Sequence, residues 1–156
     1  MADSIEQRII DLVVARMQTI DGTGDMLTDV GTRSEDSRAT WQQDELPAIS
    51  VFEGPVTSED ADDEGRTSQR TMPVMIKAFF NAESEAGNSA AFARKAISDI
   101  FRAIRSDDQW IDSDGVELAV FTGEKSHAID YDNFEITGVQ VEIEIVYRGS
   151  KFNLEA

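Results

Sequence analysis

The acidic segment at residues 57–66 contains residues with the spacing of a calcium-binding loop. Asp60, Asp62 and Glu64 alternate along the chain and a glycine follows them, as in the first half of an EF-hand loop. The twelfth position of such a loop should be a bidentate glutamate, but here it is Thr71, and no helical pattern flanks the segment. We therefore expect a solvated, mobile acidic loop and no metal site.

Two further motifs that could carry chemistry are incomplete. His127 is the only histidine, so a histidine-based metal cluster is impossible, and a Ser–His–Asp arrangement would rest on common residues alone. Gly22-Thr23-Gly24 lacks the third glycine of a dinucleotide loop, and it follows a helical pattern where that loop would follow a strand. The chain has no cysteine, which excludes thiol chemistry and thiolate metal sites. We expect a protein that is not an enzyme and has no cofactor.

The charge balance limits the partners of the protein. Of 156 residues, 31 are acidic and 14 are lysine or arginine, which gives a net charge of −17. A free basic groove for nucleic acid is not expected, because phosphate binding depends on Lys and Arg. No run of about eighteen apolar residues is present, so we expect no membrane span. The first residues lack the basic start and apolar block of a secretion signal, and the absence of cysteine suits a cytoplasm.

Four of the 14 basic residues share one side of a short helical pattern: Arg94, Lys95, Arg102 and Arg105. Two interpretations stay open. One is a solvated helix face, whose last two cations lie favourably near the negative end of the helix dipole. The other is a contact with an acidic surface of a neighbouring copy, which would orient assembly more than tighten it. The acidic residues available for that contact are Glu59, Asp60, Asp62, Asp63 and Glu64.

The spacing of apolar residues predicts the elements that position these side chains. Helical spacing predicts a helix at residues 4–20, with Ser4 as its N-cap, and a second helix at residues 90–105. Alternating apolar residues predict strands. Their ranges are 46–52, 67–80, 116–121 and 134–147.

Three positions refine this outline. Pro73 favours an edge position or a break for the second strand, and the change of parity at Thr137-Gly138 predicts a bulge in the last. Trp110 is expected to be a packing anchor behind the second helix. Residues 123–132 are expected to connect the last two strands, with a short strand at 127–129.

The order of these elements is helix, strands, helix, strands. This order predicts an α+β fold in which an antiparallel-dominated, mixed sheet of four to six strands has two main helices packed on one face. The length suits a single domain over residues 1–156. A short C-terminal tail is expected at residues 149–156.

The same layout resembles the tail-terminator, or tail-completion, proteins of long-tailed phages and related tailed viruses. The stretches that carry the resemblance are an LPAISVF-type strand at 46–52, a strand at 70–80, the Ala-rich helix, a strand at 116–122, and the closing GVQVEIEIVYR strand at 138–148. The resemblance spans nearly the whole chain and rests on pattern and order.

The resemblance implies a structural role in the virion. Such proteins form a ring, usually of six copies, that caps the tail tube, ends its polymerisation and joins the tail to a head-side connector or head-closure protein. DNA passes through the ring without sequence-specific binding, and acidic residues lining the channel would repel it. Outer positions of the last strand, Glu142, Glu144 and Arg148, are then candidates for subunit contacts together with the basic helix face.

Two alternatives from other classes remain. The chain could be a small acidic adaptor or regulatory domain that binds a basic protein partner through its acidic surface. A hydrolase built on scattered carboxylates ranks last, because paired carboxylates occur everywhere in so acidic a chain. A virion protein would be made in the host cytoplasm and found at the junction of head and tail.

Overall fold

The computed structural model describes residues 4–60, 67–81, 89–106, 110–111, 117–130 and 136–150. The two helices are α1, Ile5–Gln18, and α2, Ser89–Ile104, and a short 3-10 helix, η1, covers Gln43–Glu45. The strands are β1 Ser34–Asp36, β2 Ala48–Glu53, β3 Thr57–Asp60, β4 Thr67–Asn81, β5 Trp110–Ile111, β6 Glu117–Asp130 and β7 Ile136–Ser150. None of the helices in these ranges is long and apolar enough to span a membrane.

The strands form one mixed sheet, as predicted. Its order is β1-β2-β4-β7-β6-β5, and β3 pairs with β4 beside this path. Only β1 and β2 run parallel, and every other pairing is antiparallel. The α+β class and the mostly antiparallel sheet are therefore confirmed.

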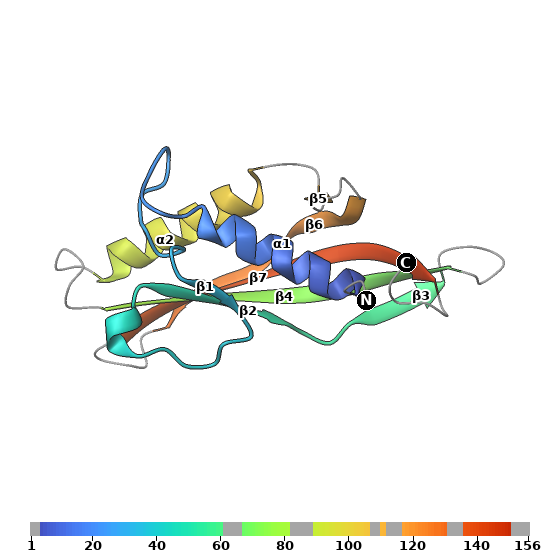
Figure 1. The fold of residues 1–156 in the computed structure, drawn as a ribbon, viewed down its shortest axis with the longest axis horizontal. Helices are drawn as coiled ribbons and strands as arrows, with labels where there is room; N and C mark the ends of the chain where they lie inside the picture. The colour runs from blue at the N-terminus through green and yellow to red at the C-terminus, as the bar shows by residue number, and fades with distance from the viewer. Residues whose placement is uncertain are drawn as a thin grey trace.

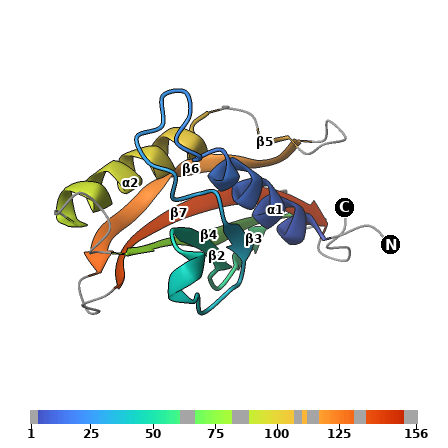
Figure 2. The same ribbon diagram turned by 60° about the vertical axis from the view of Figure 1, so that its left-hand side comes forward.

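Both helices lie on the same face of the sheet, as Figures 1 and 2 show. Even-numbered residues of β4 and odd-numbered residues of β7 are buried on that face, because side chains alternate along a strand. The sheet residues buried there include Met72, Val74, Ile76, Ala78, Val141, Ile143 and Ile145. The helix residues that complete the core include Ile9, Val13, Met17, Ala96 and Ile100. Each buried aliphatic side chain of this size contributes about 1.5–3 kcal/mol.

The helix boundaries agree with the predicted ranges to within two residues. Ser4 is the N-cap of α1, and its hydroxyl accepts a hydrogen bond from the backbone N–H of Gln7 at 3.1 Å. Trp110 is buried behind α2, as expected for a packing anchor.

Pro73 does not mark an edge strand or a break in β4. Strand β4 has neighbours on both sides, and it continues through Pro73. The Pro73 carbonyl accepts a hydrogen bond from the Gly54 N–H at 2.7 Å. The N–H and C=O of a residue in an antiparallel strand face the same neighbour, so the hydrogen bond that proline cannot donate would also lie on this side. On that side β2 ends at Glu53 and β3 begins at Thr57. The proline is tolerated because the ladder is interrupted in the neighbouring strands.

The predicted bulge at Thr137-Gly138 is wrong. Through those residues β7 pairs with β4 without a change of register. The register shifts lie in β6 instead, between Phe121 and Gly123 and between Glu124 and Ser126. Gly123 has φ +134°, a conformation that glycine adopts without a side-chain clash. Two bulges interrupt the alternation of β6. One strand, Glu117–Asp130, joins the predicted strand at 116–121 to the predicted short strand at 127–129, so the connection expected between them is wrong.

The first four residues of the predicted acidic loop at 57–66 form a strand, which is a correction to that prediction. Thr57–Asp60 forms β3 and pairs with β4, while residues 61–66 lie outside the described part of the chain. The prediction of a C-terminal tail at residues 149–156 is wrong for Gly149 and Ser150, which belong to β7. Residues 151–156 are outside the described part.

Two buried charged residues attach α2 to the rest of the fold. Asp99 is fully buried, and its carboxylate accepts hydrogen bonds from the backbone N–H groups of Leu27 and Thr28 at 2.9 and 2.7 Å. Arg16 of α1 donates a hydrogen bond to the carbonyl of Ile104, the last residue of α2, at 2.7 Å. Its guanidinium carbon also lies 4.3 Å from the centre of the Trp110 ring. These contacts fix the position of α2 over the sheet.

We expect Asp99→Asn to lower the free energy of unfolding by about 1–3 kcal/mol. The side-chain NH2 group of asparagine would replace a carboxylate oxygen that now accepts hydrogen bonds from the backbone N–H groups of Leu27 and Thr28. Urea unfolding followed by circular dichroism measures the change. The control is Ser98→Ala at an exposed position of the same helix, which should change stability by less than about 0.5 kcal/mol. Equal stability of the two variants would contradict the role of Asp99.

Candidate functional site

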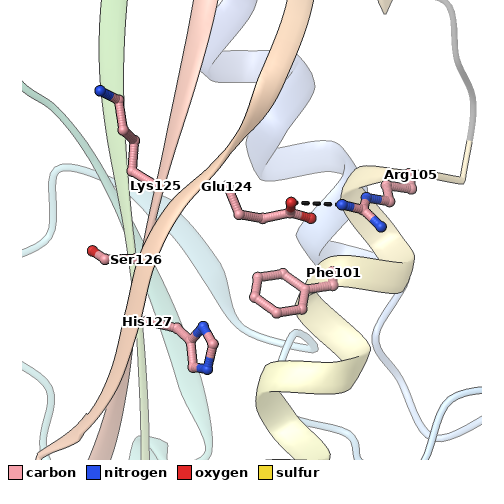
Figure 3. Close-up of a pocket in the computed structure, with 6 residues that line it drawn as sticks. All are labelled: Phe101, Arg105, Glu124, Lys125, Ser126 and His127. Carbon is pink, nitrogen blue, oxygen red and sulfur yellow. Dashed lines mark hydrogen bonds and ion pairs between the residues drawn. The ribbon is translucent and has the colours of Figure 1, made fainter.

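A cleft lies between α2 and β6. It has a volume of about 430 Å³, and its lining comes from the end of α2 and the middle of β6. The lining residues are Phe101, Arg105, Glu124, Lys125, Ser126 and His127. Figure 3 shows that Glu124 and His127 point toward α2, whereas Lys125 and Ser126 point away from it.

The contacts in this cleft are structural. The Arg105 guanidinium lies 2.5 Å from a carboxylate oxygen of Glu124 and forms an ion pair with it. The rings of Phe101 and His127 meet edge to face, with their centres 5.5 Å apart. Ser126 leaves β6 on the side opposite His127, so these two residues cannot form a nucleophile–base pair (Figure 3). No group of three His, Cys, Asp or Glu suited to a metal ion occurs among the described residues.

The basic residues predicted on α2 have different roles. Arg102 donates a hydrogen bond to the carbonyl of Asp25, and Arg105 pairs with Glu124. Arg94 and Lys95 are exposed, and neither has an ion pair with another described residue. We call the four cations of α2, Arg94, Lys95, Arg102 and Arg105, the basic flank.

The candidate contact residues of β7 lie apart from this flank. Glu142 and Glu144 are half-buried and alternate with the core residues, so they belong to the sheet face opposite the helices. Glu144 forms an ion pair with Lys125 at 3.1 Å. The backbone of Arg148 is in β7, but its side chain is outside the described part of the structure.

The acidic residues predicted as partners of α2 are only partly described. Glu59 and Asp60 are in β3, where they pair with Gln69 and Ser68 of β4, and their side chains are not described. Asp62, Asp63 and Glu64 lie outside the described residues.

A second cleft, which was not predicted, gathers carboxylates at the start of α1. It has a volume of about 130 Å³ and lies between α1, β1 and the end of β2. Its lining residues are Ser4, Glu6, Gln7, Ile10, Asp36, Ser37 and Glu53. The Gln7 amide nitrogen donates to Asp11 at 2.8 Å and to Asp36 at 3.1 Å. We call Glu6, Asp11, Asp36 and Glu53 the acidic flank.

The acidic flank carries unfavourable electrostatics. Burial, and then the charges of Glu6 and Asp36, raise the pKa of Glu53 above its ordinary value of 4.5. The Tyr147 hydroxyl donates a hydrogen bond to Glu6, and burial together with this contact raises the pKa of Tyr147. None of the four carboxylates forms an ion pair with a described cation. No sequence pattern could indicate this cleft, because distant segments contribute its residues.

No family model matches the chain, and no curated protein matches it.

We expect Glu53→Gln to raise the melting temperature at pH 7, because it removes a charge that Glu6 and Asp36 repel. A carboxyl with a raised pKa in the folded state stabilises the fold below its unfolded pKa and loses that contribution as pH rises through the folded pKa. The advantage of the variant should therefore shrink as pH falls toward 4.5. Thermal unfolding between pH 4 and pH 7 measures this.

The control for this experiment is Asp29→Asn, which removes a charge from an exposed loop position outside the acidic flank. It should raise the melting temperature at pH 7 by less than Glu53→Gln does. A Glu53→Gln protein that is no more stable than wild type at pH 7 would contradict the electrostatic interpretation of this cleft.

Proposed function

We propose that this protein is a structural component of a tailed virion. In this role copies of the chain form a ring, usually of six, that caps the tail tube, ends its polymerisation and joins the tail to the head-side connector. The α+β fold and the order of its elements support this role, since they agree with the layout on which the resemblance to tail-terminator proteins rests. We propose no enzymatic activity.

The observation that carries this role is the sheet face opposite the helices. Both α-helices cover the other face, and half-buried apolar side chains of β2, β4 and β7 lie on the face that neither of the two described α-helices covers (Figures 1 and 2). These residues are Phe52, Pro73, Met75, Phe79 and Val146. Apolar side chains gathered on one exposed face are typical of a protein contact site.

Charged residues are interspersed with the apolar ones on this face. The Lys77 ammonium lies 5.6 Å from the centre of the Phe52 ring, and Glu144 pairs with Lys125 across neighbouring strands. An apolar centre among charged side chains is the composition expected of a specific interface between soluble proteins. We assign this face to the contact with the tail tube.

The net charge suits a channel for DNA. Each copy carries a net charge of −17, so a closed ring of six copies would have a strongly negative field. DNA would be repelled from an acidic channel wall and would slide through without binding.

We expect purified protein to form closed rings with a central hole, either alone or when mixed with tail tubes from the same virus. Six copies of the 17.3-kDa chain would have a mass of about 104 kDa. Native mass spectrometry and negative-stain imaging measure the mass and the shape. A protein that remains monomeric even on tail tubes contradicts this function. A salt-sensitive one-to-one complex with a basic protein would instead support an acidic adaptor.

We expect Met75→Glu to lose attachment to tail tubes, because it places a charge in the centre of the apolar face. The matched control is Ala15→Glu, which adds the same charge on the exposed side of α1. Cosedimentation with tail tubes compares the two variants, and circular dichroism verifies that both are folded. If Met75→Glu binds tubes as well as Ala15→Glu, the open face is not the contact.

A further inference from the structure

We propose that neighbouring copies in the ring contact each other head to tail, with the basic flank of one copy against the acidic flank of the next. This inference rests on the proposed ring and names the two surfaces that would close it. The occupant of each flank is a second copy of this chain.

The positions of the flanks in the sheet make them available for such a contact. Strands β1 and β6 lie near opposite edges, with β2, β4 and β7 between them. Four steps of about 4.8 Å place β1 and β6 about 19 Å apart across the sheet. Among the described residues, β1 pairs only with β2, and β6 pairs only with β7 from Val120 to Asp130. Within the described part of the chain, each of these two strands therefore has one side without a strand partner.

The cations of the basic flank are accessible to a partner. Arg94 and Lys95 are exposed on α2 and have no ion pair within the described residues. The side chain of Arg105 is 61% exposed even though it pairs with Glu124. Four of the 14 basic residues of an acidic chain are thus placed on α2, and Arg105 at the end of this helix pairs with Glu124 of β6.

The acidic flank has the complementary property. Three of its four carboxylates, Glu6, Asp36 and Glu53, line a cleft of about 130 Å³, and none of the four pairs with a described cation. This volume equals that of about four water molecules, which suits the end of one lysine or arginine side chain. A cation from a neighbouring copy would relieve the repulsion among Glu6, Asp36 and Glu53.

The distribution of charge favours head-to-tail contacts over symmetric ones. A symmetric dimer through either edge would place like charges opposite each other, which is unfavourable. A contact between the two different edges places opposite charges together at every interface. Interfaces of this heterologous kind close into a ring when the rotation per subunit closes.

A charge-reversal experiment tests this pairing. The first variant carries Arg94→Glu and Lys95→Glu, and the second carries Asp36→Lys and Glu53→Lys; all four residues are exposed. Each variant alone should associate at least about tenfold more weakly than wild type, because like charges then meet at every interface. The control carries Asp29→Lys and Asp44→Lys, which add the same charge outside the acidic flank, and it should assemble as wild type does.

A one-to-one mixture of the two variants should restore the ring. In an alternating ring, each altered basic flank meets an altered acidic flank, and each unaltered flank meets an unaltered one. Native mass spectrometry should then find equal numbers of the two variants in each ring, which requires an even number of copies. A misfolded variant could not be rescued in this way, so rescue separates lost contacts from lost folding.

The outcomes distinguish this contact from the proposed function. If either charge-reversed variant assembles as wild type does, the head-to-tail pairing is wrong. If both variants are impaired and their mixture does not assemble, the pairing is also wrong. Neither result contradicts the proposed ring itself. Variants that keep the ring but lose binding to polylysine would identify a basic partner as the occupant of the acidic flank, which also overturns the pairing. A wild-type protein that stays monomeric with and without tail tubes overturns the ring and the pairing together.

Discussion

The pairing of β4 with β7 determines where every other surface of the molecule lies. All fifteen residues of β4 pair with the fifteen residues of β7 without a change of register. Because side chains alternate, this register places Met72, Val74 and Ile76 on the same face as Ile143 and Val141. A slip of one residue would turn one of the two apolar rows away from the helices. The open face and the two edges of the sheet follow from this register.

Two sets of charged residues have different roles on this scaffold. Arg16 and Asp99 are buried and are bound to backbone groups, so they serve the fold by attaching α2 to α1 and to the loop at Leu27 and Thr28. Arg94, Lys95 and Glu53 are exposed and have no ion pair among the described residues. In the proposed ring, the position of the exposed cations would determine the direction in which copies meet.

Much of the fold could be predicted from the sequence, because its main elements have regular apolar spacing. The odd-numbered apolar residues from Val139 to Tyr147 predicted a buried strand face, and the structure buries them. Strand β6 was predicted as two shorter strands with a connection between them, because two bulges shift its alternation. Strand β1 has three residues, too few to establish a period. The prediction of an edge position or a break at Pro73 was wrong because the cost of a proline in a strand depends on its neighbouring strands, which the local sequence does not specify.

The candidate site could be predicted only in part. The cations of α2 are visible in the sequence because helical spacing places them together. Their partners are not, since the Asp25 carbonyl and Glu124 reach Arg102 and Arg105 through the tertiary fold. The acidic flank was also hidden, because Glu6, Asp36 and Glu53 are far apart in the chain. The parallel pairing of β1 with β2 and the position of α1 bring them together.

Site-directed cross-linking tests the central claim, a closed head-to-tail ring, most directly. The chain has no cysteine, so Ser98→Cys on α2 and Ala39→Cys near β1 can be introduced at exposed positions and joined by a short bis-maleimide linker. We expect the double variant to give a ladder of cross-linked species that stops at the number of copies in the ring, and each single variant to stay uncross-linked. Dimers from a single variant, a ladder without an upper limit, or a double variant that gives only monomers would contradict a closed head-to-tail ring.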